Sequence, residues 1–492
     1  MEPLDTEAVS ELLIEIGRRT ELSGDSPFKA KAYYTAAENL LALTTPLSEL
    51  VAQGKLREIP GVGEAIAEKI IKLHKTGTHP TLEFMREQHP AGLLELFGIP
   101  GLGVKKIGIL YEQLKVASLA ELAEACRAGK LKECKGLGSA LQKKILTGLE
   151  LLQKAEGQRH LHHAEKLLSK ACENLAQSSP EFTRIVAAGP LRRGCELVDD
   201  LPIAVAGTAP GFETIQLADG LRLRVSDEAH FGINLLYATG SKAHLDALEA
   251  LAKSKGLSLN EKGLFRGKQE LPCADERDVY AALGLQFIEP ELREGRGEIE
   301  LAQKNALPEL VKLKDVRGIL HSHTTTSDGA EPLDIMADET RKRGYEYYGV
   351  ADHSKSAFYA GGMKDDKIEA QHKFADKLNA KLSSKNFRIF KGVESDILAD
   401  GELDYPDEML QRFDFIVASV HSRFTLDKDA QTKRLLNAVA NPHTTILGHM
   451  TGRLLLRREG YTVDIEEVLK ACAKHGVVVE INANPHRLDL DW

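Results

Sequence analysis

The chain has 492 residues, 42% of them hydrophobic, and a formal net charge of −9. This length allows three or more domains of ~100–200 residues each, and the acidic balance excludes a uniformly basic protein that coats nucleic acid. No apolar run approaches the ~20 residues that span a membrane, and the acidic start Met1 to Asp5 has no export leader. Six cysteines without CxxC spacing indicate reduced thiols, so we expect a cytoplasmic protein without membrane attachment.

Residues 1 to about 155 are predicted to be helical, with three similar turns at residues 59–63, 99–103 and 134–138. Each turn contains Gly-apolar-Gly and opens a helix. Glycine lets the backbone approach a phosphate closely, and the N–H groups at a helix start point toward it. The residues expected to contact phosphate are Gly61, Gly63, Gly101, Gly103, Gly136 and Gly138, with Lys105 and Lys106 in the helix after the second turn.

This arrangement is the helix-hairpin-helix pattern, which holds the DNA backbone without reading its sequence. One copy alone could be an ordinary connection between helices. The three copies, however, adjoin a cationic stretch from Lys130 to Lys170, where nine lysines and arginines face four glutamates. We therefore predict sequence-independent DNA binding.

The middle of the chain, from about 180 to 290, has a mixed pattern with strands expected at 184–188 and 221–225. Residues 289–314 are polar and predict a linker. After it, strand and helix signals alternate to the C-terminus, as in an α/β barrel.

Histidines and acidic residues follow five short apolar runs in the last third of the chain. Such runs predict buried strands, and a parallel barrel brings its strand ends to one face. Imidazole and carboxylate groups suit zinc, manganese or iron. One such histidine alone is usually a surface or core residue, but recurrence after five strands predicts two or three metals that activate water against a phosphoester. The predicted ligands are His321, His323, Asp328, His353, Glu394, His421 and His449.

Several motifs together resemble the bacterial family X DNA polymerases, which join a polymerase core to a PHP (polymerase and histidinol phosphatase) domain. The motifs are Gly189 to Gly194, Tyr237 to Lys242, Leu292 to Ile299, Thr451 to Leu454 and Glu480 to Pro485. The resemblance spans nearly the whole chain. It implies a multidomain protein with an all-α helix-hairpin-helix N-terminal region, an α+β nucleotidyltransferase core like the polymerase β palm, and an α/β PHP barrel of distorted TIM type.

The resemblance also implies domain boundaries. We expect a lyase-like helical domain with the first hairpin over 1–90 and a fingers-like DNA-binding region with two further hairpins over 91–155. A degenerate palm and thumb core is expected over 156–290, a linker over 291–314 and the PHP domain over 315–492.

The polymerase core departs from the family pattern. The family places three aspartates on neighbouring strands, which together hold two Mg²⁺ ions. Here Asp200 takes the first place, Pro202 the second and Arg222 the third, and Pro190 replaces a serine of the preceding turn. Asp200 alone provides too few ligands to bind Mg²⁺ well. We therefore predict that the polymerase site is inactive and that the fold of the core still binds DNA. Expected phosphate contacts that are retained are Arg193, Gly240 and Lys242.

The N-terminal domain resembles the family's lyase domain, which removes a 5′-deoxyribose phosphate through a lysine Schiff base. Lys69 stands at the position of that lysine, and Lys29 and Tyr33 match its phosphate-side helpers. The alternative is that Lys69 is an ordinary lysine that contacts DNA phosphate.

In the PHP domain, the family uses nine residues to bind three metals, and the seven predicted ligands match seven of these nine. This implies a Mn²⁺- or Zn²⁺-dependent 3′–5′ exonuclease, with His321, His323, Glu394 and His421 at the reacting centre. Asp352 is expected to orient a ligand through hydrogen bonds. Expected near phosphate or behind the ligands are Arg423, Arg453 and His486.

The last two family ligands, an Asp-x-His, are expected some tens of residues beyond Leu490, whereas this chain stops at Trp492. The stop predicts a shortened reading frame, or a barrel edge that a partner covers. Seven ligands suffice for two metals, and a third ion would lack part of its set.

The leading hypothesis is a DNA-repair protein whose PHP nuclease works on 3′ ends while its core holds gapped or nicked duplex DNA. One alternative is an active gap-filling DNA polymerase, which Pro202 and Arg222 oppose. Another is a catalytically dead DNA-binding scaffold. A small-molecule phosphatase is disfavoured by the three hairpins, and the oligomeric state stays open.

Overall fold

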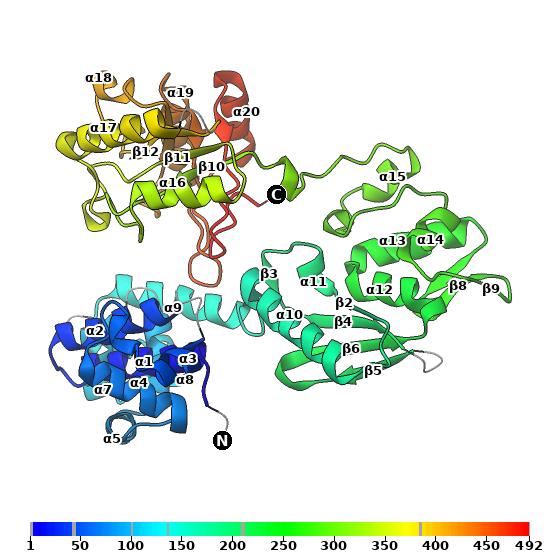
Figure 1. The fold of residues 1–492 in the computed structure, drawn as a ribbon, viewed down its shortest axis with the longest axis horizontal. Coiled ribbons are helices and arrows are strands. Elements are labelled where there is room, and N and C mark those ends of the chain that lie inside the picture. Colours follow the sequence, from blue (N-terminus) through cyan, green and yellow to red (C-terminus); the bar gives the residue numbers. More distant parts are fainter. Residues whose placement is uncertain are drawn as a thin grey trace. The chain divides into compact units, whose positions relative to one another are not determined.

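The computed structural model describes residues 3–41, 46–99, 102–134, 137–207, 212–382 and 386–491. The chain divides into two compact units, Met1–Glu156 and Gly157–Trp492 (Figure 1). In the described ranges, no helix combines the length and the apolar character needed to cross a membrane.

The first unit is helical throughout its described part, as predicted. Its apolar residues gather in two clusters, one around Val9, Leu13 and Ile70, the other around Ile107 and Leu122. The α-helices are α1 (Thr6–Leu22), α2 (Pro27–Leu41), α3 (Leu47–Gln53), α4 (Glu64–Thr76), α5 (Pro80–Gln88), α6 (Gly92–Glu95), α7 (Val104–Leu114), α8 (Leu119–Arg127) and α9 (Ser139–Lys154).

The predicted glycine turns open three of these helices. Gly63, Gly103 and Gly138 are the N-cap residues of α4, α7 and α9, and none of these helix starts has a capping side chain. The first-turn N–H groups therefore stay available to an external acceptor. Gly61 has a φ of +76°, a backbone conformation that favours glycine. The predicted contacts Gly101 and Gly136 lie outside the described residues.

The second unit begins with a helix and a four-stranded sheet in the order β2-β4-β6-β5 (Figure 1). Strand β4 pairs with β6 in parallel and with β2 in antiparallel register, and β5 pairs with β6 in antiparallel register. The elements are β1 (Arg159–His160), α10 (Leu161–Ser178), β2 (Arg184–Ala187), α11 (Gly189–Arg192), β3 (Leu197–Val198), β4 (Leu201–Ala206), β5 (Glu213–Gln216) and β6 (Leu221–Ser226).

A smaller helical part with a three-stranded sheet follows. Its elements are α12 (Phe231–Thr239), α13 (Lys242–Ser254), β7 (Ser258–Asn260), β8 (Gly263–Arg266), β9 (Gln269–Leu271), α14 (Glu276–Ala282) and α15 (Glu298–Gln303). The predicted linker needs correction here, because Ile299 and Ala302 lie in the same apolar cluster as Ile233 and Tyr280. Arg293 is fully buried and paired with Glu276, so its polar side chain does not indicate exposure.

The last part is a parallel sheet of six strands in sequence order, β10 to β15, curled into a half-barrel with helices between the strands (Figure 1). The strands are β10 (Gly318–Ser322), β11 (Tyr347–Val350), β12 (Arg388–Asp396), β13 (Phe415–Ser419), β14 (Ile446–Leu447) and β15 (Val478–Val479). The helices are α16 (Leu333–Lys342), α17 (Asp365–Leu382), α18 (Asp407–Leu410), α19 (Lys428–Ala440) and α20 (Ile465–His475). The five predicted apolar runs overlap β10 to β14.

Candidate metal centre

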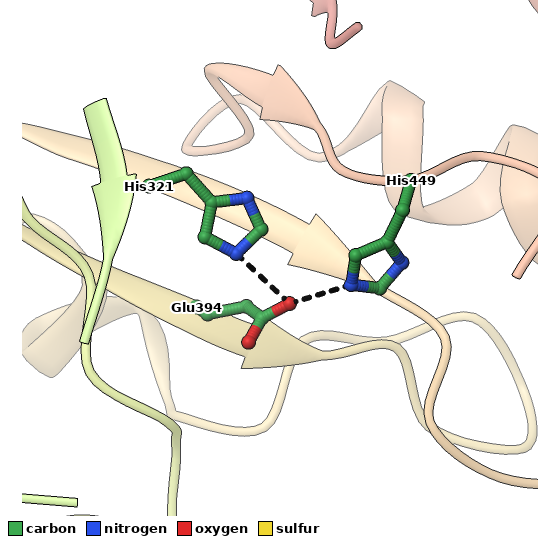
Figure 2. Close-up of side chains that lie close together, drawn as sticks. All are labelled: His321, Glu394 and His449. Atoms are coloured by element: carbon green, nitrogen blue, oxygen red, sulfur yellow. Dashed lines mark hydrogen bonds and ion pairs between the residues drawn. The ribbon is translucent and has the colours of Figure 1, made fainter. Parts of the chain in front are cut away.

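The predicted ligands come together at the carboxyl ends of the parallel strands. His321 is the penultimate residue of β10, Glu394 lies in β12, and His449 follows β14 (Figure 2). The pairing of β10 with β11 shifts register between Ile319 and Ser322, and His321 has a φ of +57°. His449 also has a positive φ, of +22°. Non-glycine residues in this region are uncommon and cluster at functional sites.

Glu394 occupies the middle of the cluster and is only 1% exposed. Its Oε1 lies 3.1 Å from His321 Nε2 and 2.9 Å from His449 Nε2 (Figure 2). The same oxygen is 3.2 Å from His421 Nε2. On the other side of the carboxylate, Oε2 lies 2.9 Å from His353 Nδ1 and 3.6 Å from His323 Nε2. One carboxylate thus faces the rings of all the predicted histidine ligands.

The ligand atoms form three groups in which all atoms lie within 4.8 Å of one another. Two groups share Glu394, and two share His353, as expected for ions that lie side by side. Asp328 joins through loop contacts of 3.7 Å to His323 Nδ1 and 3.6 Å to His353 Nε2. The groups are His321, Glu394 and His449; His353, Glu394 and His421; and His323, Asp328 and His353.

The electrostatics of the cluster favour cations. Burial alone would raise the pKa of Glu394, but the charges of His321 and His421, together with the hydrogen bond from His321, hold it well below the ordinary value. Burial alone would lower the pKa of His321, yet Glu394 and Glu480 raise it to about 10. In the same way, Glu394 and Asp396 outweigh burial and raise the pKa of His421 to about 9. The carboxylates therefore attract positive charge into a buried space.

The donor set fits divalent metals. Among the described residues, the buried atoms Glu394 Oε2, His323 Nδ1 and His449 Nδ1 have no hydrogen-bond partner. Buried polar atoms normally have partners, and orphaned ones at a site suggest a missing ion. Imidazole nitrogens with carboxylate oxygens are ligands of Zn²⁺ and Mn²⁺.

Two carboxylates behind the ligands were not predicted as site residues. Glu480 Oε1 accepts a hydrogen bond from His321 Nδ1 at 2.5 Å, and its Oε2 accepts one from the His449 backbone N–H at 2.8 Å. Asp396 Oδ1 accepts from His421 Nδ1 at 2.7 Å. Alternate residues of a strand face the same side. Asp396 lies two residues after Glu394 in β12, so this spacing could have predicted Asp396 as a site residue.

Asp352 makes its hydrogen bonds to the loop that carries Asp328 and to α17. Its carboxylate accepts hydrogen bonds from Thr324 N at 2.7 Å, Ser327 Oγ at 2.5 Å and Gln371 Nε2 at 2.6 Å. Asp352 therefore holds the loop that carries Asp328. None of these three hydrogen bonds is with a histidine.

The cluster opens into a cavity of about 520 Å³, lined by all seven predicted ligands. Its wall also includes Glu480, Asn482 and Arg487. Arg487 was not predicted, although it follows the motif from Glu480 to Pro485. Two predicted phosphate contacts lie elsewhere: Arg423 is exposed, and neither it nor Arg453 lines the cavity.

Arg453 and His486 instead join the half-barrel to the core within the second unit. Arg453 forms a two-bond ion pair with Glu196, with both distances at 3.1 Å. His486 Nδ1 lies 3.3 Å from His160 Nε2. These side chains therefore make structural contacts within the second unit.

The predicted polymerase site contains an ion pair. Pro202 and Arg222 are register partners in β4 and β6, and Asp200 lies just before β4. The Arg222 guanidinium pairs with the Asp200 carboxylate. Pro202 packs so closely on Gly189 that a Cβ there would lie 2.7 Å from its ring. Asp200, which takes the first of the three aspartate positions of the family, is thus already paired with a positively charged side chain, that of Arg222.

Two of the residues expected to contact nucleotide phosphate, Arg193 and Lys242, already pair with other residues of the chain. Arg193 donates to Glu294 Oε1 and to the Thr239 carbonyl, both at 2.6 Å. Lys242 is exposed and pairs with Asp246 at 2.5 Å, and Gly240 is the C-cap of α12.

The lyase residues lie in the first unit. Lys69, in α4, is partly exposed, and its Nζ is 3.5 Å from the Ala65 carbonyl. Lys29 pairs with Asp25 at 3.0 Å, whereas Tyr33 packs against the apolar cluster of α1 and α4. Among the described residues, no hydrogen bond joins Lys69 to Lys29 or Tyr33. Lys105 is exposed and Lys106 half-buried at the start of α7.

Family models match four parts of the chain. The model of a helix-hairpin-helix domain matches residues 5–79, and the model of a SAM-like helix-hairpin-helix tandem matches residues 93–150. The DNA polymerase beta thumb model matches residues 234–294 and the PHP domain model residues 320–484.

Curated relatives extend this pattern. A DNA polymerase/3′-5′ exonuclease PolX of Bacillus subtilis is 35% identical, over 97% of this chain and 87% of its own length. A probable phosphatase of Caldanaerobacter subterraneus is 28% identical over 34% of this chain and 63% of its own length. One of Thermoanaerobacter sp. is 30% identical over 33% of this chain and 62% of its own.

Proposed function

The chain belongs to the bacterial family X DNA polymerases that carry a PHP domain, and we propose that within this family its PHP metal centre is the working catalytic site. The observation that carries the proposal is a contrast between two carboxylates. Glu394 faces a ring of imidazoles, whereas Asp200 is paired with Arg222. We infer that the polymerase core is inactive and serves to hold DNA.

We propose that the reaction is hydrolysis of the phosphodiester at a DNA 3′ end, with Mn²⁺ or Zn²⁺ in the centre. Divalent ions held there would polarise water for attack on phosphorus and neutralise the charge that grows on the phosphate oxygens. His321 and His421 keep their Nδ1 protons on Glu480 and Asp396, which turns each Nε2 toward Glu394. Arg487, in the cavity wall, supplies a positive charge for the substrate.

We propose that the first unit holds DNA together with the polymerase core. Three helix starts without capping side chains, and Lys105 beside one of them, suit backbone phosphates of either strand. We propose gapped or nicked duplex DNA with a free 3′ end as the substrate, because binding without sequence preference fits damage that occurs anywhere.

The test compares two substitutions in the full-length protein. Glu394→Gln should lower digestion of a 3′-labelled strand by more than about 100-fold, since loss of an outer hydrogen-bond partner alone costs 10–100-fold, and should lower the bound metal measured by elemental analysis. Asp200→Asn should leave digestion unchanged, and the parent protein should extend no primer with Mg²⁺ or Mn²⁺.

Each other outcome has a meaning. Robust primer extension by the parent protein would make it a gap-filling polymerase and overturn the inactive core. Digestion that survives Glu394→Gln would remove the PHP centre as the catalyst. A parent protein that binds DNA but neither retains metal nor digests DNA would be a scaffold.

DNA binding by the hairpins has its own measurement. Lys105→Ala should weaken duplex binding equally for unrelated sequences and reduce the slope of log affinity against log salt by about 1. Lys304→Ala, a change outside the first unit, serves as the control. An unchanged slope for Lys105→Ala would remove this lysine from the interface.

A further inference from the structure

Two adjacent aromatic side chains stand in solvent beside the metal centre. Phe358 is 84% exposed and Tyr359 is 64% exposed. They form a short 3₁₀ turn, Phe358–Ala360, between β11 and α17. Large aromatic rings usually bury most of their surface in a core or an interface, so two such rings side by side need an explanation other than the fold of this loop.

The turn is held firmly at its start. Ser356 donates to Asp404 from its backbone N–H at 2.6 Å and also through its hydroxyl. The buried Ala357 accepts hydrogen bonds from the backbone N–H groups of Ala360 at 2.9 Å and Gly362 at 3.1 Å. Gly362 lies so close to Ser354 that a Cβ there would be 2.0 Å from the Ser354 carbonyl oxygen.

The turn is held equally firmly at its end. Met363 N–H donates to the His353 carbonyl at 2.8 Å, and the Met363 carbonyl accepts from the Tyr405 hydroxyl at 2.5 Å. Lys367 Nζ donates to the Gly361 carbonyl at 2.9 Å and to the Thr326 carbonyl at 2.8 Å. The last bond ties the turn to the loop that precedes Asp328. The rings therefore project from a fixed backbone, which lowers the entropy cost of binding a flat partner.

The rings lie next to the ligand cluster. The Tyr359 ring centroid is 6.4 Å from that of His353, and the Phe358 ring centroid is 6.1 Å from that of Tyr359. Burial, followed by the charges of Asp396, Glu394 and Asp328, raises the pKa of Tyr359 to about 12. The phenol is therefore neutral at physiological pH and sits within the field of the site's carboxylates.

We propose that Phe358 and Tyr359 form a stacking platform for the bases at the 3′ end of a DNA strand whose phosphodiester enters the metal centre. This inference rests on the proposed function, because it deepens the substrate class of the same site. When a phosphate of the DNA strand lies among the histidines, the bases one or two nucleotides away along that strand lie near the Phe358 and Tyr359 rings. Aromatic side chains stack on any base, since every base has a π face, and this suits an enzyme without sequence preference.

The experiment compares normal 3′ ends with ends whose last two nucleotides are abasic. With the parent protein, the abasic ends should raise KM by about 5- to 100-fold, the range that base stacking supplies. The double variant Phe358→Ala and Tyr359→Ala should raise KM for normal ends to the abasic value and leave KM for abasic ends unchanged. The conservative pair Phe358→Trp and Tyr359→Phe should keep the preference.

Phe374→Ala is the matched control, because Phe374 is a 39% exposed aromatic on α17. It should leave both KM values unchanged. Since Phe358 and Tyr359 are exposed, their removal should leave the melting temperature of the protein unchanged. Equal KM values for normal and abasic ends in the parent protein would overturn the platform while leaving the nuclease intact.

A second readout separates the platform from the nuclease. 2-Aminopurine at the 3′ end loses fluorescence when it stacks, so the parent protein should quench it and the double alanine variant should not. Quenching without any DNA digestion would keep the platform and remove the proposed nuclease. Digestion with equal quenching by the parent and the double alanine variant would remove the platform and point to a protein partner for these rings.

Discussion

At Glu394, the surrounding side chains decide what a single carboxylate can do. It is buried at the centre of histidines from four other segments of the chain. Asp200 also had a predicted metal role, but a neighbouring strand supplies Arg222 to it. A carboxylate that already has a fixed cation has less affinity for Mg²⁺, whereas imidazoles give up their protons to make room for a metal.

Asp396 offers a test at this scale. Asp396→Asn removes the negative charge behind His421 and should weaken Mn²⁺ or Zn²⁺ binding by about 10- to 100-fold, because such partners fix the ring and raise its basicity. Calorimetric titration with each metal measures this. Asp376→Asn removes an ion pair with Lys391 that contacts none of the predicted ligands, and it should leave the metal affinity unchanged. Equal affinities for the parent and Asp396→Asn would show that this hydrogen bond is dispensable.

At the scale of elements, helix starts and strand ends supply the functional groups. The glycine turns set where α4, α7 and α9 begin, and the parallel strands carry the ligands to one edge of the sheet. The helices between the strands cover the apolar face. One of them, α17, buries a histidine: His372 is 7% exposed and packs edge-on against Phe413, with ring centroids 5.0 Å apart.

His372 predicts a pH dependence of stability. Burial, followed by the charges of Lys391 and Arg412, lowers its pKa from 6.5 to about 4, against smaller opposing effects of Asp376 and Asp414. The unfolded chain therefore binds a proton as pH falls below about 6.5, while the folded chain binds it only near 4. The contribution of His372 to the free energy of unfolding is fully present above pH 6.5, and the free energy of unfolding falls by about 3 kcal/mol as the pH drops to 4.

His372→Leu should remove this part of the pH dependence. Urea unfolding of the parent and the variant between pH 7 and pH 4 gives the difference in the free energy of unfolding at each pH. That difference should shift in favour of the variant as pH falls. A constant difference across the range would mean that His372 does not titrate in this window.

At the scale of the whole molecule, polar side chains join the core and the half-barrel of the second unit. Arg453 binds Glu196 and also donates to the Arg487 carbonyl at 2.9 Å. Arg453→Met leaves the half-buried Glu196 without its cation and should lower the free energy of unfolding of the second unit by about 1–3 kcal/mol. Calorimetry of the full chain should show the loss.

Arg317→Met is the matched control, because Arg317 and Glu346 form an exposed ion pair with 69% and 51% of their side chains accessible. Such pairs contribute at most about 1 kcal/mol. If both variants lower stability equally, the Arg453 contact has no special role in joining the two parts.

The sequence by itself determined what depends on local spacing. The Gly-apolar-Gly turns predicted the starts of three helices, and short apolar runs predicted β10 to β14 together with the ligands that follow them. Periodicity and turn chemistry act over a few residues, so they are visible in the chain. The family motifs added the expected order of domains and the departures at Pro202 and Arg222.

The tertiary structure alone decided which side chains meet across long separations. It paired Arg222 with Asp200, placed Glu480 and Asp396 behind the histidines, and grouped the ligands into three sets. It also buried Arg293 in a stretch that had predicted a linker. A polar residue on its own indicates exposure, and only a partner brought close by the fold offsets the cost of burying it. That partner lies in another element, beyond the reach of any local pattern.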